Sequence, residues 1–184
     1  MVGKIEVICG PMFASKTGEL LKRIRRLLVT NKKCALITYK KDTRYDENGL
    51  LCTHDQIKAP DNENLITIST GEPIDKLLLS DVDTVFIDEG QFMKGLIDFT
   101  ISNSKNGTNV IISALDMDFR GNPFGEIPHL LCIAHSLKKL TAICYKCNGE
   151  AHYSERFTDE QDEEVIGGSD KYRACCKDCF MFGK

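Results

Sequence analysis

The stretch Gly10-Pro11-Met12-Phe13-Ala14-Ser15-Lys16-Thr17 decides the fold, because it separates a predicted strand from a predicted helix. The preceding segment, Lys4 to Cys9, alternates in polarity and is rich in β-branched residues, which indicates a strand. The following segment repeats apolar residues at helical spacing, namely Leu20, Leu21, Ile24, Leu27 and Leu28. Backbone N–H groups at such a helix start point at a bound anion, so the stretch is a candidate phosphate-binding loop.

The stretch fits the phosphate-loop pattern G-x-x-x-x-G-K-[ST] at every position except Ser15, where glycine is usual. In this reading, Lys16 reaches the β- and γ-phosphates of ATP and the Thr17 hydroxyl ligates Mg²⁺. Because Ser15 has a Cβ that glycine lacks, we expect local strain or weaker nucleotide binding. On this motif alone, an ordinary strand–turn–helix with no phosphate remains an open alternative.

A second acidic segment, Val85-Phe86-Ile87-Asp88-Glu89, ends another buried strand. Asp88 is the expected Mg²⁺ residue facing Thr17, and Glu89 is placed to accept a proton from an attacking hydroxyl. The alternative is a pair of acids that cap a helix. The phosphate loop and this acidic segment occur along the chain in the order expected for the two parts of one magnesium–phosphate site. This favours a catalytic role over helix capping, so we expect the two segments to converge in the fold.

The rest of the chain alternates predicted strands with predicted helices, which indicates an α/β fold with a parallel sheet covered on both faces. With the phosphate loop, this predicts a P-loop NTPase of the RecA-like kind. A polar loop, flexible or ordered by ligand, is expected from Lys40 to Asn64. Further strands are expected at Cys34–Tyr39, Leu65–Ser69, Thr84–Ile87, Asn109–Leu115 and Lys139–Ile143, and helices at Pro73–Leu79, Gln91–Ser104 and Pro128–Ser136.

Five of the nine cysteines lie between Cys144 and Cys179. Two C-x-x-C pairs, Cys144 with Cys147 and Cys176 with Cys179, supply the four thiolates of a structural zinc site. Their 28-residue spacer is longer than in most zinc ribbons, and Cys175 leaves the register of the second pair ambiguous. A thioredoxin-like redox pair is the alternative. We therefore expect a kinase-type domain over residues 1–143 and a zinc-ribbon-like module over 144–184.

Composition excludes several classes of protein. A hydrophobic fraction of 42% supports a packed core, and a formal net charge of −3 disfavours a generic nucleic-acid binder. We expect no membrane span and no signal peptide, which makes the cytoplasm the default compartment.

The chain resembles the type II thymidine kinases, the family of the cytosolic cellular, bacterial and poxviral enzymes. The resemblance covers nearly all 184 residues. It is carried by the phosphate stretch and by Asp42-Thr43-Arg44-Tyr45, Cys52-Thr53-His54-Asp55, Asp88-Glu89-Gly90-Gln91-Phe92, Leu115-Asp116 through Phe119 to Pro123-Phe124-Gly125, Lys139 to Cys144, and Ile166-Gly167-Gly168 through Tyr172. The departures from the family pattern are Ser15 and Cys175.

The resemblance implies transfer of the γ-phosphate of ATP to the 5′-hydroxyl of thymidine, giving dTMP for DNA synthesis. By it, Glu89 is the general base, and Lys16 and Arg44 stabilise the transferring phosphoryl group. Thr17 and Asp88 hold Mg²⁺, and a Zn²⁺-pinned loop closes over thymine. The implied thymine contacts are Met12, Leu115, Phe119, Phe124, Val165, Ile166, Gly167, Gly168 and Tyr172; for Phe124, a purely structural role in the core stays equally open.

The resemblance also implies a homotetramer that is inhibited by dTTP; that it binds neither nucleic acid nor membrane is expected from its charge and hydropathy. Two other functions remain as alternatives. One is a non-catalytic nucleotide-binding zinc protein, favoured only by Ser15. The other is a RecA-like ATPase acting on nucleic acid, in which Glu89 would orient water.

Overall fold

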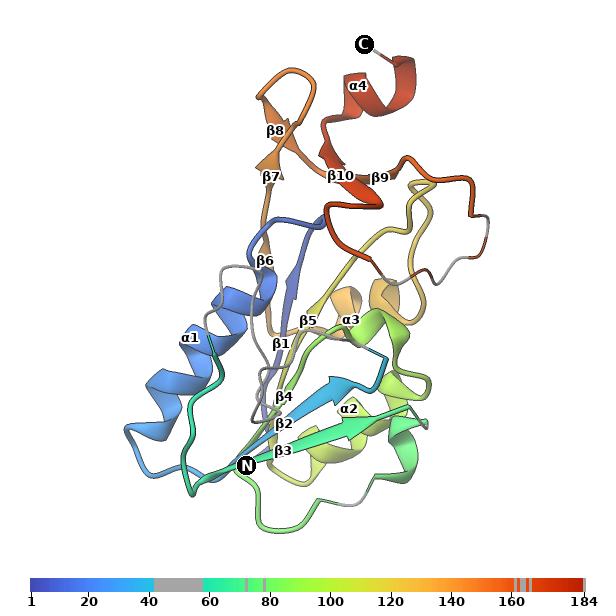
Figure 1. The fold of residues 1–184 in the computed structure, drawn as a ribbon. Coiled ribbons are helices and arrows are strands. Elements are labelled where there is room, and N and C mark those ends of the chain that lie inside the picture. Colours follow the sequence, from blue (N-terminus) through green and yellow to red (C-terminus); the bar gives the residue numbers. More distant parts are fainter. Residues whose placement is uncertain are drawn as a thin grey trace.

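The centre of the protein is a parallel β-sheet with the strand order β3-β2-β4-β5-β1-β6 (Figure 1). The computed structural model describes residues 1–41, 58–71, 73–77, 79–160, 162, 165 and 167–183, and every neighbouring pair of strands in this sheet is parallel. The predicted parallel α/β sheet is confirmed. Its strands are β1 Ile5–Cys9, β2 Cys34–Tyr39, β3 Leu65–Thr70, β4 Thr84–Ile87, β5 Asn109–Ala114 and β6 Ser136–Lys139.

The central strands are buried on both faces, as continuous apolar runs require in a parallel sheet. Every residue of β2 and of β4 is buried, whereas the edge strand β3 has only half-buried and exposed positions. This pattern explains why the interior strands read as unbroken hydrophobic segments in the sequence.

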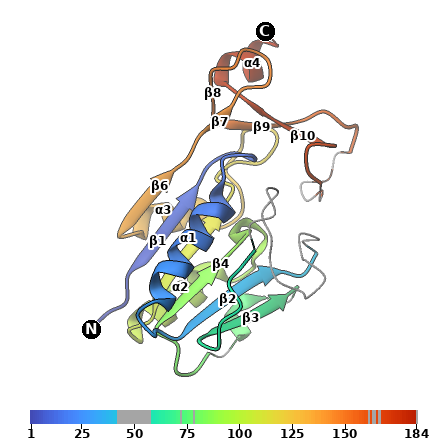
Figure 2. The same ribbon diagram turned by 60° about the vertical axis from the view of Figure 1, so that its left-hand side comes forward.

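Helices cover both faces of the sheet (Figure 2). On one face lies α1, Lys16–Leu28, and on the other lie α2, Leu96–Lys105, and α3, Ile127–Ile133. The α1 face is filled by Leu20, Leu21, Ile24, Ile8, Leu36 and Phe86. The opposite face is filled by Leu96, Phe99, Leu130, Val7, Ile37, Val85 and Ile112.

A small cysteine module, defined here as β7 to α4, lies beyond the carboxyl ends of the strands (Figure 1). Its elements form two antiparallel pairs, β7 with β8 and β9 with β10, followed by a short helix. Its core includes Ala14 of the turn after β1. The module is therefore packed against that turn. Its elements are β7 Ala142–Ile143, β8 Glu150–Ala151, β9 Tyr153–Arg156, β10 Tyr172–Cys175 and α4 Lys177–Phe182.

The strand predicted over Lys139–Ile143 is wrong as a single element. Lys139 ends β6 of the central sheet, and Ala142 begins β7, which pairs with β8 in the cysteine module. The helix predicted over Pro128–Ser136 ends at Ile133, because Ser136 pairs with Glu6 of β1. The stretch Lys139–Ile143 is therefore divided between two sheets. Periodicity in the sequence cannot show which strand each part pairs with.

Two other predicted helices are shorter in the structure. The segment expected as a helix from Gln91 to Ser104 begins with a single 3-10 turn, η2, Gly90–Phe92, and only then continues as α2. Gly95, with φ of 75°, sits between them and breaks the helix. The helix expected over Pro73–Leu79 is one 3-10 turn, η1, Ile74–Lys76, after which the backbone becomes extended.

The polar loop expected from Lys40 to Asn64 lies largely outside the described residues, which resume at Lys58. Across the described part of the chain, no helix combines the length and apolar character needed to cross a membrane.

Candidate active site

The turn between β1 and α1, residues 10–17, is called the phosphate turn below. Gly10 has φ of 143°, and a Cβ there would lie 2.3 Å from the Leu140 carbonyl oxygen, so no side chain fits. Phe13 and Ser15 have φ of 64° and 58°. Left-handed backbone costs a non-glycine residue about 1–2 kcal/mol, so the strain expected at Ser15 is present. Such strain is characteristic of functional turns.

The phosphate turn and the end of β4 converge, as predicted. The Thr17 hydroxyl donates to Asp88 at 3.2 Å from Oδ1 and 3.1 Å from Oδ2. Both residues are buried, at 7% and 1% exposure. Lys16 folds back over the turn, where its Nζ donates to the Pro11 carbonyl at 2.8 Å. A hydroxyl, a carboxylate and an ammonium group therefore meet at the start of α1.

Glu89 follows Asp88 directly and is fixed by its neighbours. Its backbone is left-handed, with φ of 53° and ψ of 42°. Gln91 Nε2 donates to Glu89 Oε2 at 2.5 Å, and Gln91 Oε1 accepts the backbone N–H of Leu115 at 2.9 Å. The buried amide of Gln91 thus ties the Glu89 carboxylate to the end of β5.

One buried hydroxyl near this site has no hydrogen-bond partner among the described residues. This hydroxyl belongs to Ser113, which is 1% exposed. Ile112 of β5 pairs with Ile87 of β4, so the residues that follow them, Ser113 and Asp88, lie at equivalent places on neighbouring strands. Because alternate strand residues share a face, Ser113 lies on the face that α1 covers, with Ile111. Hard oxygen groups gathered in this way suit Mg²⁺, which prefers oxygen ligands and keeps several waters.

An ion pair holds the strand ends around the phosphate turn. Lys139 Nζ of β6 lies 2.8 Å from Asp116 Oδ2, just after β5, and β1 runs between these two strands. The hydrogen bond to Asp116 raises the pKa of Lys139. Burial, reinforced by the Asp116 charge, raises the pKa of the Cys9 thiol to about 11, so this thiol stays neutral under the turn.

The predicted thymine contacts lie on several elements. Leu115 is half-buried, and Phe124 is buried with its ring edge-on to Phe92 at a centroid distance of 5.5 Å. Phe119 lies against the guanidinium of Arg156, 3.7 Å from the ring centroid, and against that of Arg120 at 4.6 Å. These aromatics come from the segment after β5, beside the end of β4.

Hydrogen bonds hold the segment before β10 to the start of that strand, and β9 contacts the phosphate turn. Tyr172 is buried, and its hydroxyl donates to the Val165 carbonyl at 2.7 Å. The Gly168 carbonyl accepts the backbone N–H groups of Lys171 and Tyr172 at 3.1 and 2.9 Å. Gly167 is half-buried. The Met12 N–H of the phosphate turn donates to Ser154 Oγ at 2.9 Å.

The structure brings the four predicted zinc ligands together. The sulfurs of Cys144, Cys147, Cys176 and Cys179 lie within 4.8 Å of one another. Two of them, on Cys147 and Cys176, are 3.6 Å apart. Tetrahedral zinc with Zn–S bonds of about 2.3 Å places sulfurs about 3.8 Å apart, so the cluster fits that ion. The second pair thus begins at Cys176 rather than Cys175.

The four thiols differ in acidity, because burial and the neighbouring sulfurs raise the pKa of Cys179, whereas Cys144 is the thiol with a lowered pKa. Burial alone would raise the pKa of Cys144, but backbone N–H groups of Cys176, Cys147 and Lys146 lower it to about 6. A thiolate is the form that binds zinc.

Two predicted site residues, Arg44 and Ile166, lie outside the described residues. Conversely, Gln91, Ser154 and Arg156 occupy the site although the sequence assigned them no role. Gln91 could have been suspected from its place two residues after Glu89. Nothing in the sequence marks Ser154 or Arg156, because an alternating strand does not reveal what its polar residues contact.

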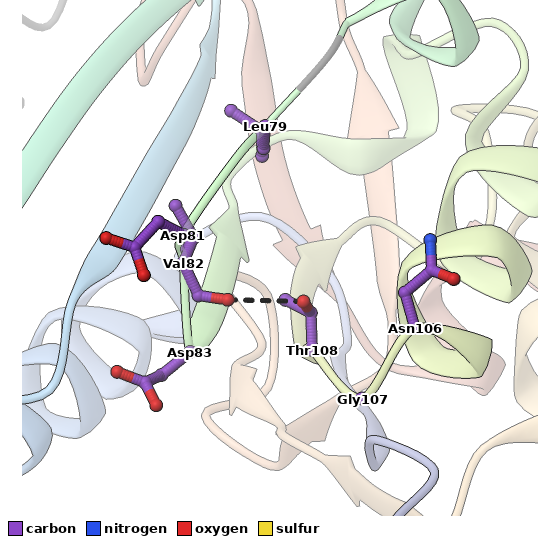
Figure 3. A pocket seen from close by; sticks show the side chains of 7 residues that line it. All are labelled: Leu79, Asp81, Val82, Asp83, Asn106, Gly107 and Thr108. Carbon is purple, nitrogen blue, oxygen red and sulfur yellow. Dashed lines mark hydrogen bonds between the residues drawn. The ribbon is translucent and has the colours of Figure 1, made fainter.

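A separate cavity of about 360 Å³ lies at the amino ends of the central strands β4 and β5. It is lined by Asp81 and Asp83 before β4 and by Thr108 before β5, whose hydroxyl donates to the Val82 carbonyl at 3.2 Å (Figure 3). Ligands of parallel α/β sheets bind at the carboxyl ends of the strands. This cavity therefore does not belong to the site described above.

Comparison with known proteins agrees with the resemblance seen in the sequence. The thymidine kinase family model matches residues 3–180. Thymidine kinase 1 of Dictyostelium discoideum is 42% identical over 183 residues, covering 98% of this chain and 78% of the relative. The human cytosolic thymidine kinase is 40% identical over 186 aligned residues, with coverage of 97% and 74%. The fowlpox virus thymidine kinase is 40% identical over 183 residues, and the alignment covers 97% of each chain.

Proposed function

This chain belongs to the thymidine kinase family, and from that premise we propose how its residues divide the work of phosphorylating thymidine with ATP. The observation that supports the proposal best is the hydrogen bond between Thr17 and Asp88, with Glu89 one residue further on. It joins the phosphate turn to the acids of β4, which is the arrangement that phosphoryl transfer needs.

Glu89 is the proposed general base. Its carboxylate takes the proton of the thymidine 5′-hydroxyl while that oxygen bonds to the γ-phosphorus of ATP and the bond to the β-phosphate oxygen breaks. The products are thymidine monophosphate and ADP. Gln91 holds the carboxylate through its 2.5 Å hydrogen bond, so that the base needs little reordering during the reaction.

The phosphate turn is the proposed site of the ATP phosphates, from Gly10 to Thr17. Lys16 Nζ would exchange the Pro11 carbonyl for phosphate oxygens and stabilise the transferring group, together with Arg44. Thr17 and Asp88 would hold Mg²⁺, and the buried Ser113 hydroxyl, which has no hydrogen-bond partner among the described residues, adds to the fit. When bound, Mg²⁺ neutralises charge on the β- and γ-phosphates.

The nucleoside is proposed to lie beside Glu89, between the segment after β5 and the segment before β10. Backbone groups of residues 165–168 would read the edge of the base. Leu115, Phe119 and Tyr172 would pack around its ring, with Met12 at the turn. Phe124 supports this wall through its contact with Phe92. Enclosure of this kind excludes water from the reacting phosphate.

A structural Zn²⁺ is proposed at Cys144, Cys147, Cys176 and Cys179, whose sulfur spacing fits that ion. It would fix both ends of the chain between β7 and α4. Ordering a glycine-containing segment is entropically costly, and anchoring both ends lowers that cost.

A homotetramer, inhibition by dTTP and a cytosolic location are further proposals, taken from family membership. Exposed apolar side chains, Ile133 of α3 and Leu137 of the edge strand β6, support an assembly through this edge. Light scattering on the purified protein measures the assembly, and steady-state inhibition measures the response to dTTP.

The proposed function is tested by coupling ADP release to an optical readout, with and without thymidine. We expect ADP release that requires thymidine and yields thymidine monophosphate in equal amount. ATP hydrolysis stimulated by DNA but not by thymidine would instead support a nucleic-acid-dependent ATPase, and would contradict the proposal.

A further inference from the structure

Arg156, the last residue of β9, uses all three nitrogens of its guanidinium group within the cysteine module. Its Nη1 donates to the carbonyls of Glu160 at 3.0 Å and Asp162 at 2.5 Å. Its Nε and Nη2 donate to the Tyr172 hydroxyl at 3.1 and 2.8 Å. A planar guanidinium supplies five donors in a fixed fork, so one side chain can hold several acceptors at once.

These acceptors lie at separate points of the chain between β9 and β10. Glu160 and Asp162 come early in that segment, and Tyr172 is the first residue of β10. The Tyr172 hydroxyl, which accepts from Arg156, in turn donates to the Val165 carbonyl at 2.7 Å. The described residues between Phe157 and Lys171 form no helix or strand. Side-chain contacts of this kind therefore replace the backbone ladder that orders the central sheet.

The same guanidinium reaches the wall formed after β5. It stacks on the Phe119 ring at 3.7 Å from the centroid and lies 5.2 Å from the centroid of the Tyr172 ring. An arginine over an aromatic face adds cation–π attraction to its hydrogen bonds. Arg156 is thus a single group that contacts the segment between β9 and β10, the residue that opens β10, and the segment after β5.

We propose that Arg156 is the positioning residue that holds the Glu160 and Asp162 carbonyls and the Tyr172 ring in the arrangement that receives the thymine base. The inference rests on the proposed function, which places the segment between β9 and β10 over the nucleoside. Arg156 acts through backbone carbonyls and a phenol, not on the reacting atoms. Its effect therefore falls on thymidine binding and not on ATP binding.

The test compares Arg156→Lys with Arg173→Lys in the full-length, zinc-loaded enzyme. Arg173 is the control, because it lies on the paired strand β10 and stacks on Tyr145 and on Phe157, at the start of the segment only. Lysine keeps the charge but cannot reproduce the fork. The readouts are KM for thymidine, KM for ATP, kcat, zinc content, and backbone hydrogen exchange in peptides covering residues 158–171, which leave Phe157 out.

For Arg156→Lys we expect faster exchange in those peptides and a KM for thymidine raised about tenfold, as loss of charge-assisted hydrogen bonds implies. The KM for ATP and the zinc content should stay at wild-type values, and Arg173→Lys should resemble wild type. Should Arg156→Lys fail to fold, Tyr172→Phe removes only the shared hydroxyl, and the same rise in KM for thymidine, about threefold, is expected.

Unchanged hydrogen exchange in Arg156→Lys would overturn the holding role of Arg156. Faster exchange with an unchanged KM for thymidine would instead overturn the placement of this segment over the base, and with it that part of the proposed function. Equal effects from Arg173→Lys would show a general loosening of the module and would also overturn the inference.

Discussion

The two halves of the candidate active site are held together in different ways. The phosphate half is built from strand ends and a helix start on a large apolar core, with Ile8, Phe86 and Leu20 fully buried beneath it. The proposed nucleoside half combines the segment after β5 with the cysteine module. The small core of that module is made mainly of alanines and cysteines: Ala142, Ala151, Ala174, Cys144, Cys175 and Cys179. Small modules of this kind usually need a metal or other cross-link to fold stably.

Because of this difference, we expect single substitutions to affect the two halves in different ways. Hydrogen-bonded strands fix the phosphate half before any ligand binds, so its residues can be changed one at a time without loss of the fold. The nucleoside half depends on a few polar contacts and on four sulfurs. A single change there should alter the order of a whole segment. The predictions below test this contrast, beginning with the largest expected effect.

Glu89→Gln should remove the chemistry of the phosphate half and leave its structure intact. We expect kcat to fall by roughly two to four orders of magnitude, as for loss of a general base, with ATP binding retained. Calorimetric titration with ATP and the coupled assay measure the two quantities. Turnover close to wild type would remove Glu89 from the role of base.

Cys147→Ser should disable mainly the nucleoside half. We expect about one zinc per chain in the wild type and its loss in the variant, with thymidine affinity reduced at least tenfold. ATP affinity should fall less than thymidine affinity, because Thr17 is held by Asp88 at the end of β4, although Ala14 and Met12 of the phosphate turn also contact the module. Cys132→Ser, at an exposed cysteine of α3, is the matched control. Metal analysis that finds no zinc in the wild type would refute the assignment.

Gln91→Leu tests whether the Glu89 carboxylate must be held. The substitution removes the donor to Glu89 and the acceptor for the Leu115 N–H but keeps much of the buried volume. We expect kcat to fall about tenfold while both KM values stay within about twofold, since a misoriented base affects the chemical step. A rise in KM with normal kcat would assign Gln91 to substrate binding instead.

Ser15 offers the smallest effect, confined to the backbone of the phosphate turn. Glycine tolerates φ of 58° without strain, whereas alanine does not. Ser15→Gly should therefore be more stable than Ser15→Ala by about 0.5–1 kcal/mol, after the extra unfolded-state entropy of glycine is counted. Urea denaturation of the two variants measures the difference. Equal stability would mean that residue 15 is not left-handed.

The phosphate half was predictable from the sequence because parallel strands end at one edge of the sheet. Once Lys4–Cys9 and Thr84–Ile87 were recognised as strands, Thr17 and Asp88 had to approach each other. The cysteine spacing likewise predicted a four-sulfur cluster. The partners of β6 and β7 were not predictable, because a short apolar run does not specify its neighbour.

The side-chain contacts of the nucleoside half were not predictable either. Arg156 lies in a part of the sequence for which no helix or strand was predicted. Two of its acceptors are backbone carbonyls, which no residue type reveals, and the third is the Tyr172 hydroxyl. Gln91 was visible within a family motif, but only the geometry connects it to Glu89 and Leu115.

The central claim is that the phosphate turn and the end of β4 form one magnesium-dependent nucleotide site. A double-mutant cycle with Thr17→Val and Asp88→Asn tests it most directly, with ATP affinity measured by calorimetry in the presence and absence of Mg²⁺. We expect each single variant to lose most of the magnesium-dependent affinity, and the double variant to lose no more than either. Losses that simply add would show that the two residues act on separate sites, and would contradict the account.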